Sequence, residues 1–374
     1  MAITRIGNIA STIPDDSIQN VKFSNIVQSK NIIINGDMSI AQRGTSVTGI
    51  TGSGYNTIDR YQLDLSGLGT WTQSQDTDVP TGQGFATSLK MDCTTADASP
   101  AAGDQLRIQT KFEGQNLQYL KKGTSSAQST TLSFWVKSVK TGTYIIHLFD
   151  NDNSRSISKS YTISSASTWE YKNITFPGDT SGVFDNNNAT SLFVQFYLGA
   201  GSNYTSGTLN TSWNSYTAAN SAVGQVNLAD STSNNFWITG VQLEAGTTAS
   251  EFEFLPYDVN LRRCQRYYMR WQGDTSDQRS IANGLCCGTG QVRMIVVYPT
   301  TLRTNPTVTE VGLETLNAVK VATAVSLDAT VDPGINGVNA QISADSGTPY
   351  TVGQAVSLRT STSASAFLAV DAEL

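Results

Sequence analysis

The sequence contains a single histidine, His147, among 374 residues. A zinc cluster or a histidine-pair acid–base mechanism needs further imidazole groups, so the sequence argues against both. Cysteine is nearly as scarce, and the four cysteines show no CxxC spacing. Two of them, Cys286 and Cys287, are adjacent, and adjacent cysteines rarely bridge each other without strain. We therefore expect reduced and mostly buried cysteines, and a neutral, hydrogen-bonded histidine in the core or at an interface.

Charged residues are few, at 14% of the chain, and the net charge is −6. A general nucleic-acid-binding protein normally presents a basic face, so we expect no nucleic-acid partner. No apolar run approaches the roughly 20 residues of a membrane span, and residues 1–19 lack the charged and apolar regions of a secretory signal. We therefore expect no membrane insertion. Serine, threonine, asparagine and glycine are abundant instead, which is typical of β-rich extracellular or virion proteins.

Segments of alternating apolar and polar side chains follow one another through the middle of the chain. In "TLSFWVKSV", Leu132, Phe134 and Val136 face one way, while Trp135 is on the polar side. Trp135 could be a binding platform, but we expect a neighbouring loop or subunit to cover it. The six clearest segments are residues 131–139, 144–150, 156–164, 168–176, 191–199 and 234–246. Their separation by Gly, Asn, Asp and Ser predicts an antiparallel sandwich, with strands starting from Asn31 onwards.

The last hundred residues continue in the same style. Further segments of strand character lie at residues 291–299, 305–311, 324–331, 338–344, 355–361 and 365–374. No repeat of fixed period is present, so neither a propeller nor a solenoid is expected. This part is long enough to form a second, small β-domain.

The stretch from Val241 to Trp271 joins these two parts. Phe252 and Phe254 share one face of an extended segment and are expected to clamp it onto the sandwich. Pro256 then stops strand pairing. The sequence therefore predicts a domain junction, in which a short helix follows the extended segment.

Asp258 is the predicted N-cap of this helix, with Leu261, Cys264 and Tyr268 on one stripe. The same helix carries the densest group of cationic side chains in the sequence: Arg262, Arg263, Arg266 and Arg270. Arginines can bind anionic glycans or phosphate by bidentate contacts. We favour the alternative, in which they pair with Glu251, Glu253 or a neighbouring subunit.

The chain is thus predicted to be all-β. It would consist of an N-terminal attachment segment, a jelly-roll β-sandwich, a short linking helix and a second small β-domain. The corresponding bounds are residues 1–30, 31–257, 258–271 and 272–374.

Several segments together resemble a family of bacteriophage tail-fibre and virion structural proteins. They are "NIIINGDMSIAQRG", "IDRYQLD", "LSFWVKS", "FWITGVQLEAG", "EFEFLPYDVNLRRCQRYY" and "FLAVDAEL". The resemblance covers roughly residues 31–271 and continues through "YPTTLRTNPTVT". Its most specific part is residues 242–268, where a turn, an aromatic pair and a capped helix occur in that order. The resemblance implies a carbohydrate-binding-module-like jelly roll followed by a small C-terminal β-domain.

The resemblance also implies a function. It indicates a virion structural protein of a tailed phage, a fibre-type adhesin that attaches to a host-surface glycan as a homotrimer. Residues 1–30 would bind other virion proteins, and the protein would lie in the tail or another external appendage after assembly in the host cytoplasm. Two alternatives stay open: a head fibre or capsid decoration protein, and a glycan-cleaving tailspike.

The residues best suited to sugar binding lie in "GSNYTSGTLNTSWNSYTAAN", residues 201–220. They are Tyr204, Trp213 and Tyr216. Aromatic rings stack on the apolar faces of sugars, while amides and hydroxyls bind the sugar hydroxyls. The mixture of rigid aromatics with Ser, Gly and Asn resembles that of antibody paratopes. The alternative is an ordinary long loop whose Trp213 packs on the edge of the sandwich.

No cofactor is predicted, but a structural calcium ion is kept as an alternative. Asp150, Asp152 and Ser154 place oxygen side chains at calcium-loop spacing. The glycine and distal glutamate of an EF-hand loop are missing, and hairpin turns favour the same residue types. Carbohydrate-binding-module-like jelly rolls often carry such an ion.

No enzymatic activity is expected. A glycosidase needs two carboxyl groups roughly 5–10 Å apart across the scissile bond. Glu251 and Glu253 fall on one face and Glu244 is close in sequence, yet glutamates on an edge segment usually serve to blunt the edge. The sequence also shows no β-helical repeat of the kind that long fibre depolymerases have.

Overall fold

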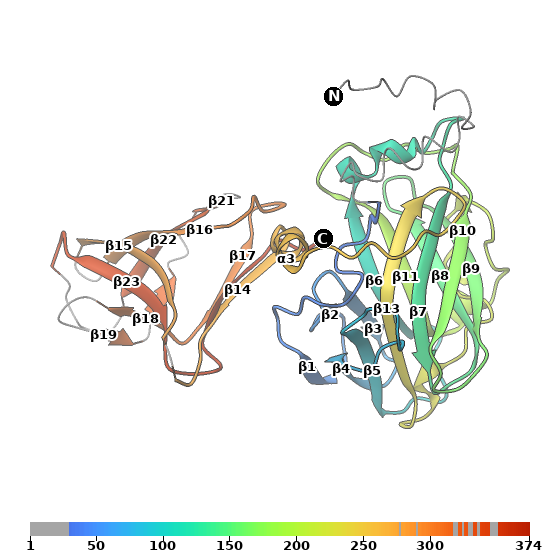
Figure 1. The fold of residues 1–374 in the computed structure, drawn as a ribbon, viewed down its shortest axis with the longest axis horizontal. Helices are drawn as coiled ribbons and strands as arrows, with labels where there is room; N and C mark the ends of the chain where they lie inside the picture. The colour runs from blue at the N-terminus through green and yellow to red at the C-terminus, as the bar shows by residue number, and fades with distance from the viewer. Residues whose placement is uncertain are drawn as a thin grey trace, which may run out of the picture.

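The computed structural model describes residues 30–276, 278–288, 291–316, 321–323, 325–327, 332–334, 337–344 and 351–374. Two β-rich lobes are joined through helix α3, which lies between them (Figure 1). We call residues 30–256 the first lobe and residues 266–374 the second lobe. The predicted all-β fold is confirmed. No helix in the described ranges is both long and apolar enough to cross a membrane.

The first lobe is a sandwich of two antiparallel sheets. The six-stranded sheet has the order β1 (Ser46–Ile50), β4 (Thr70–Asp76), β5 (Ser88–Thr95), β13 (Asn235–Ala245), β7 (Thr130–Ser138) and β10 (Glu170–Phe176). The seven-stranded sheet has the order β12 (Asn214–Ser215), β9 (Arg155–Ile163), β8 (Gly142–Asp150), β11 (Thr190–Ala200), β6 (Gln105–Glu113), β3 (Gln62–Ser66) and β2 (Gly54–Tyr55). The six predicted central strands correspond to β7 to β11 and β13.

The core of the first lobe lies between these sheets. Leu132, Phe134 and Val136 all face it, as the alternation in their segment predicts. Phe134 of the six-stranded sheet meets Phe196 of the seven-stranded sheet edge-to-face, with ring centroids 5.3 Å apart. Short helical turns occur in the connecting loops: η1 (Gly114–Asn116), η2 (Gln118–Leu120), α2 (Ser202–Thr205), η3 (Ala218–Asn220) and η4 (Leu228–Asp230).

The second lobe also contains two sheets. A three-stranded sheet has the order β14 (Tyr268–Gln272), β24 (Phe367–Asp371) and β17 (Thr307–Val311). The larger sheet has the order β19 (Val321–Thr323), β18 (Leu313–Leu316), β23 (Ala355–Thr360), β15 (Ser280–Gly288), β16 (Gln291–Val297), β22 (Gly337–Ala344) and β20 (Val325–Leu327), with β21 (Asp332–Gly334) paired to β22. Each of the predicted tail segments contains one of these strands. Part of the segment 324–331 lies outside the described residues, as do residues 1–29.

Helix α3 (Tyr257–Gln265) is shorter than the predicted helix. The chain leaves the helix before Tyr268 and enters strand β14, so Tyr268 lies in a sheet. The prediction of Asp258 as N-cap is also wrong, because the helix begins at Tyr257 and Pro256 occupies the capping position without a side-chain hydrogen bond. Cys264 is buried as predicted.

The segment Asn31–Ile40 is not a strand, contrary to the sequence prediction, and the first strand begins at Ser46. Asparagine side chains explain the difference, because they compete with a sheet for the backbone hydrogen-bonding groups. The Asn35 amide donates to the carbonyl oxygens of Ile40 and Asp59 and accepts from the Ile40 N–H. The segment therefore forms an irregular plug, held by amides.

The predicted aromatic clamp is present. The rings of Phe252 and Phe254 lie 4.8 Å apart, and both pack on Phe85 at centroid distances of 5.0 and 5.1 Å. The cysteines are free as predicted; three are buried, and Cys287 is exposed.

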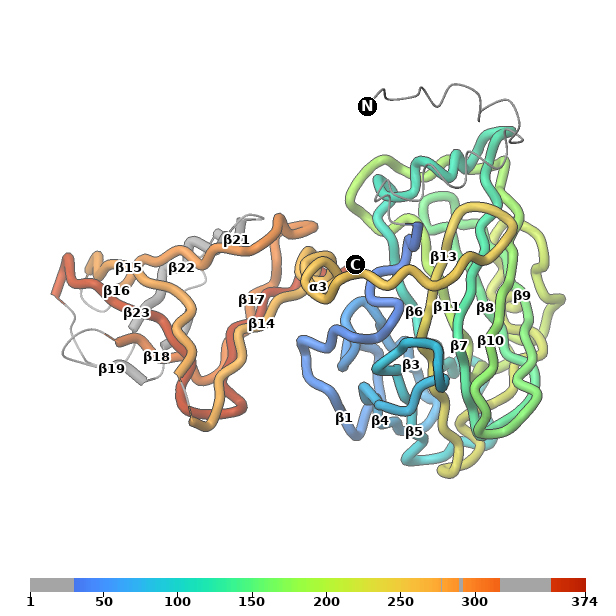
Figure 2. The backbone as a smooth tube through the Cα atoms, viewed as in Figure 1, coloured from blue at the N-terminus to red at the C-terminus, as the bar shows by residue number. Residues whose placement is uncertain are grey.

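The chain returns to the first lobe at its last residues (Figure 2). We call Asp371–Leu374 the clasp segment. The carboxylate of Glu373 pairs with Arg60 of the first lobe and lies 3.5 Å from the guanidinium of Arg43. Asp371 is 3.1 Å from the same Arg43 group. The carbonyl oxygen of Leu374 accepts hydrogen bonds from Tyr55 and Lys111. The two lobes are therefore tied together at the clasp segment as well as through α3.

Candidate functional site

A row of five polar side chains crosses the outer face of the seven-stranded sheet. Each member is the direct cross-strand neighbour of the next, because the register aligns them on five successive strands. In order from β3 to β9 they are Gln62, Gln109, Gln195, His147 and Ser158. We call Gln62, Gln109 and Gln195 the amide row.

The amide row is internally hydrogen-bonded. Gln195 Nε2 donates to Gln109 Oε1 at 2.7 Å, and Gln109 Nε2 donates to Gln62 Oε1 at 2.6 Å. Gln109 and Gln195 are buried among their neighbours, whereas Gln62 is half-buried. The row therefore forms an ordered polar surface on the sheet, and its end at Gln62 is accessible to solvent.

His147 continues the row beneath the loop formed by residues 201–222. Its Nδ1 is 2.8 Å from the Ser158 hydroxyl, which itself donates to the Ser221 carbonyl. Ser158 must therefore accept from His147, so the Nδ1–H tautomer is present and Nε2 is left as an acceptor. Nε2 has no hydrogen-bond partner in the described part of the chain. Burial and, to a smaller extent, the charge of Arg107 lower the pKa of His147 to about 3. The histidine is thus neutral, as predicted, but only one of its two nitrogens is satisfied.

Three aromatic side chains lie beside this polar row, and we call them the aromatic cluster: Phe149, Phe193 and Tyr216. All three are half-buried. The ring of Phe149 lies 5.7 Å from that of Phe193 and meets the ring of Tyr216 edge-to-face at 4.9 Å. Rings held at different angles in this way present both faces and edges to a bound molecule.

Charged groups border the same face. Arg107 holds Asp64 through two nitrogens, at 2.8 and 2.7 Å, and donates to the hydroxyl of Tyr197. The ammonium of Lys111 lies 5.4 Å from the ring centroid of Phe193. The outer face thus combines half-buried rings with amide, hydroxyl and paired ionic groups, which is a composition suited to a polyhydroxylated ligand.

The three residues predicted for sugar binding are not brought together. Tyr216 belongs to the aromatic cluster, and Tyr204 lies in the same loop against Tyr197 at the border of this face. Trp213 lies apart: it packs against the core, and its indole N–H donates to the Pro177 carbonyl at 2.8 Å. This placement matches the alternative of packing on the sandwich edge, so we leave Trp213 out of the candidate site.

Sequence reasoning missed Phe149, Phe193 and the amide row. A signal was present, because each of these side chains occupies an outward position beside core residues of its own strand. In "SLFVQFYLG", for example, Phe193 and Gln195 alternate with the core residues Val194 and Phe196. The alternation alone does not reveal which strands lie side by side, and the site depends on that adjacency.

Trp135 lies on the outer face of the other sheet. It is half-buried and covered by Tyr171 of the adjacent strand β10, with ring centroids 5.4 Å apart. The cross-strand neighbour thus supplies part of the cover, and the predicted cover by a loop or subunit stays a prediction. Tyr171 itself is 42% exposed.

In the described part of the chain, the two carboxylates of the calcium alternative have other partners. Asp150 binds the ammonium of Lys122 at 2.5 Å, and Asp152 accepts from the Asp185 N–H. Among the described residues, no three His, Cys, Asp or Glu side chains gather as metal ligands. A lysine therefore provides the positive charge next to Asp150.

Two of the three glutamates weighed as catalytic groups, Glu244 and Glu253, have structural partners. Glu244 accepts from the backbone N–H and the hydroxyl of Ser250, both at 2.7 Å. Glu253 accepts from the Asn31 N–H at 2.9 Å. These carboxylates fasten loops to the sandwich.

The sequence matches no protein-family model and no curated protein. Among solved structures, the chain is similar to the enzymatically active domain of tailspike protein 4 of bacteriophage CBA120, with 14% identity and a TM-score of 0.30 over 58% of this chain and 21% of that one. The chain thus spans about a fifth of that tailspike structure. It is also similar to a family 61 carbohydrate-binding module in complex with β-1,4-galactotriose, with 8% identity and a TM-score of 0.30 over 58% and 99%.

A third similar structure is the family 11 carbohydrate-binding module of a Clostridium thermocellum cellulosomal cellulase, with 13% identity and a TM-score of 0.27 over 59% and 99% of the two chains. Likenesses at this level carry no argument about what this chain binds. The functional conclusion therefore has to come from its own residues.

The protonation of His147 gives a pH prediction. Its pKa is about 3 in the folded chain, against about 6.5 when unfolded. Between these two pH values the unfolded state binds a proton that the folded state does not. The stabilisation of the folded state that results from this pKa difference is therefore complete above pH 6.5, and it decreases by about 1.4 kcal/mol per pH unit below pH 6.5. We expect the stability difference between wild type and His147→Gln to shift by roughly 2 kcal/mol against wild type from pH 7 to pH 5. Urea unfolding at both pH values measures it.

The comparison with the variant is necessary because burial raises the pKa of Asp59 to about 7, which acts in the opposite direction. Asp59 is present in both proteins and cancels in the difference. An unchanged difference between pH 7 and pH 5 would show that the folded chain accommodates a protonated His147.

Proposed function

We propose that the chain is a glycan-binding protein whose binding site is the outer face of the seven-stranded sheet. The observation that carries this proposal is the aromatic cluster beside the amide row. Stacking of a sugar ring on Phe149, Phe193 or Tyr216 would bury apolar C–H groups, while Gln62 and the bordering Arg107 and Lys111 would bind hydroxyls. The site is assembled on paired strands, so little ordering would be needed on binding.

We further propose that the protein acts as a fibre-type adhesin of a tailed phage virion, as a homotrimer, with residues 1–30 attaching it to other virion proteins. The resemblance in sequence supports this placement. An exposed apolar patch on the larger sheet of the second lobe supports self-association: Leu285, Ile295 and Val297 are 57%, 59% and 72% exposed. Three weak sites held together would raise the apparent affinity through effective concentration. A head fibre or capsid decoration protein would use the same face.

The test compares wild type with Phe149→Ala on immobilised polysaccharides from host cell surfaces and in calorimetric titrations with oligosaccharides. Loss of one stacking ring is expected to weaken binding about tenfold, which corresponds to about 1.4 kcal/mol. Light scattering on the same wild-type preparation is expected to give three times the mass of one chain.

Tyr171→Ala is the matched control, because Tyr171 is an exposed ring on the opposite face of the sandwich. It is expected to bind like wild type. If Tyr171→Ala weakens binding and Phe149→Ala does not, the site lies on the other sheet. Absence of binding to any glycan would overturn the proposed function.

A further inference from the structure

The last residue of the clasp segment lies at the border of the proposed glycan-binding face. The Leu374 carbonyl oxygen accepts hydrogen bonds from the Lys111 ammonium at 2.5 Å and from the Tyr55 hydroxyl at 3.1 Å. Both donors belong to strands of the seven-stranded sheet, β6 and β2. Register places Lys111 directly opposite Phe193 of the aromatic cluster. It places Tyr55 directly opposite Gln62, the accessible end of the amide row. The second lobe therefore reaches both parts of the candidate site.

Lys111 connects the clasp segment to the aromatic cluster. Its ammonium lies 5.4 Å from the ring centroid of Phe193, within the range of cation–π contacts. An ammonium has three donors, and in the described part of the chain the Leu374 oxygen takes one of them. A sugar ring stacked on Phe193 would thus meet N–H donors next to the aromatic ring, where its hydroxyl groups lie.

The backbone of Lys111 is also held by the clasp segment, through Arg60. One terminal nitrogen of Arg60 donates to the Lys111 carbonyl oxygen at 2.7 Å, and the other pairs with the Glu373 carboxylate. Burial lowers the pKa of Lys111, and the charge of Glu373 partly offsets this shift. The Glu373 side chain is only 5% exposed, so it is not available for contact with a ligand. The clasp segment therefore orders both ends of Lys111 from beneath the face.

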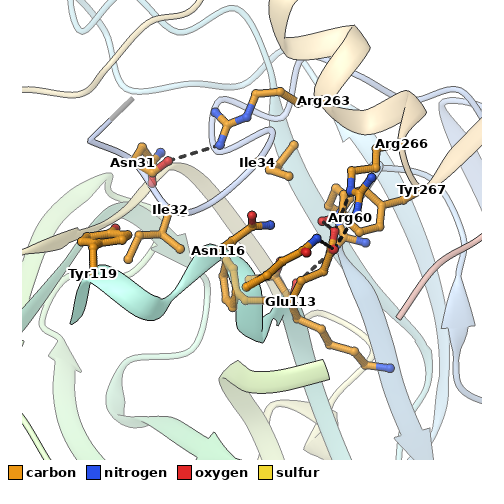
Figure 3. A pocket seen from close by; sticks show the side chains of 14 residues that line it. Asn31, Ile32, Ile34, Arg60, Glu113, Asn116, Tyr119, Arg263, Arg266 and Tyr267 are labelled. Carbon is orange, nitrogen blue, oxygen red and sulfur yellow. Dashed lines mark hydrogen bonds and ion pairs between the residues drawn. The ribbon is translucent and has the colours of Figure 1, made fainter. Parts of the chain in front are cut away.

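Glu113, an acidic side chain at the same junction, does not take the place of Glu373. Figure 3 shows Arg60 close to Glu113, Arg266 and Tyr267. Arg266 donates to both oxygens of Glu113, at 2.8 and 2.7 Å, and the Tyr267 hydroxyl adds a third hydrogen bond at 2.5 Å. Arg266 thus has the interface role predicted for the arginine group, with Glu113 as its partner. The carboxylate that pairs with Arg60 is that of Glu373.

We propose that Glu373 and Leu374 are positioning residues of the glycan-binding site, which hold the Lys111 ammonium where it binds a hydroxyl group of the sugar stacked on Phe193. Both act through Lys111. Without them the lysine side chain would be free to rotate, and ordering it on binding would cost entropy. This inference rests on the proposed function, since Lys111 borders the face that is proposed to bind the glycan.

The first measurement needs no glycan. Full-length wild type and Glu373→Gln are treated with an N-hydroxysuccinimide ester of acetate, and mass spectrometry of peptides follows the acetylation of Lys111. We expect Lys111 to react roughly fivefold faster in Glu373→Gln, the factor that corresponds to one lost hydrogen bond. Glu314→Gln is the matched control, because Glu314 pairs with Arg359 within the second lobe and its side chain is 13% exposed. Equal rates in wild type and Glu373→Gln would overturn the inference.

The second measurement uses the immobilised host-surface polysaccharides that test the proposed function. Calorimetry first selects a temperature at which every variant is folded. We expect Glu373→Gln and Lys111→Met each to weaken binding roughly fivefold. In the Lys111→Met background, Glu373→Gln should weaken binding no further, because both substitutions remove the same contact. Glu314→Gln should bind like wild type.

Losses that add in the double variant, or equal losses in Glu373→Gln and Glu314→Gln, would overturn the positioning role, because general destabilisation has these effects. Phe149→Ala separates this result from the proposed function. Binding that is weakened by Phe149→Ala but not by Glu373→Gln overturns this inference and leaves the proposed function standing. Absence of binding by wild type overturns the proposed function and this inference with it, even where the acetylation rates differ as expected.

Discussion

Replacing Lys122 with methionine is expected to lower the free energy of unfolding by about 3–5 kcal/mol. The Lys122 ammonium is surrounded by four oxygens: Asp150 at 2.5 Å, Asp179 at 3.1 Å, and the carbonyl oxygens of Ser181 at 3.0 Å and Gly182 at 2.7 Å. Only 5% of the lysine side chain is exposed, and the two carboxylates are at 0% and 4%. Methionine has a similar length but no charge, so it would leave Asp150 buried without its cation.

The second carboxylate is less affected, because Arg155 also binds Asp179 through two nitrogens, at 2.7 and 2.9 Å. The loss of stability therefore arises mainly from the uncompensated charge of Asp150. Urea unfolding at pH 7 measures the change in the free energy of unfolding. Lys172→Met is the control: Lys172 pairs with Glu170 nearer the surface, and a loss below about 1 kcal/mol is expected. Equal losses in the two variants would contradict a special role for the buried ammonium.

Glu373→Gln is expected to have the second-largest effect, a loss of about 3 kcal/mol from the stability of the docked lobes. Its carboxylate pairs with Arg60, whose side chain is only 2% exposed. Burial lowers the pKa of Arg60, but the charge of Glu373 and the neighbouring Tyr267 and Tyr55 together raise it by more, so the net direction is upwards. Without that charge, Arg60 would remain buried against the Tyr267 ring, at 3.5 Å from its centroid, with its charge uncompensated.

Calorimetry measures this loss of stability as a lower unfolding temperature. Small-angle scattering would detect a larger radius of gyration if the lobes separate. Asp371→Asn is the matched control in the same clasp segment. Asp371 contacts Arg43, but its side chain is 41% exposed, so a change below about 1 kcal/mol is expected. Unchanged calorimetry and scattering for Glu373→Gln would show that the remaining contacts hold the lobes together without this ion pair.

Strands were predictable because their signal is local. The alternation of Leu132, Phe134 and Val136 has the period of a strand, and no distant residue is needed to recognise it. The plug at Asn31 and the start of α3 were not predictable by the same rule. In both places a single side chain determines the backbone conformation. The Asn35 amide bonds to the backbone groups that a strand would use. Pro256 fixes the backbone conformation of the position before the helix.

The candidate site depends on distant residues. Gln109 lies 47 positions from Gln62, and Gln195 lies 86 positions from Gln109, yet register makes them direct neighbours. Alternation within one strand shows that such residues face outward, but it does not show which strand lies alongside. Tyr216 could be selected from composition because its loop is rich in aromatics. The same criterion selected Trp213, whose packing depends on a distant carbonyl group.

The clasp segment also determines how the molecule would carry a mechanical load. Strands β14 and β24 pair with Tyr268 opposite Asp371, so the second lobe begins and ends at the same point beside the first. Tension between the lobes would be shared by the covalent link after α3 and by the noncovalent contacts of Arg60 and Arg43 with the clasp segment. These contacts would have to break together before the link alone bore the force. In the proposed adhesin, such a joint would resist rotation of one lobe against the other.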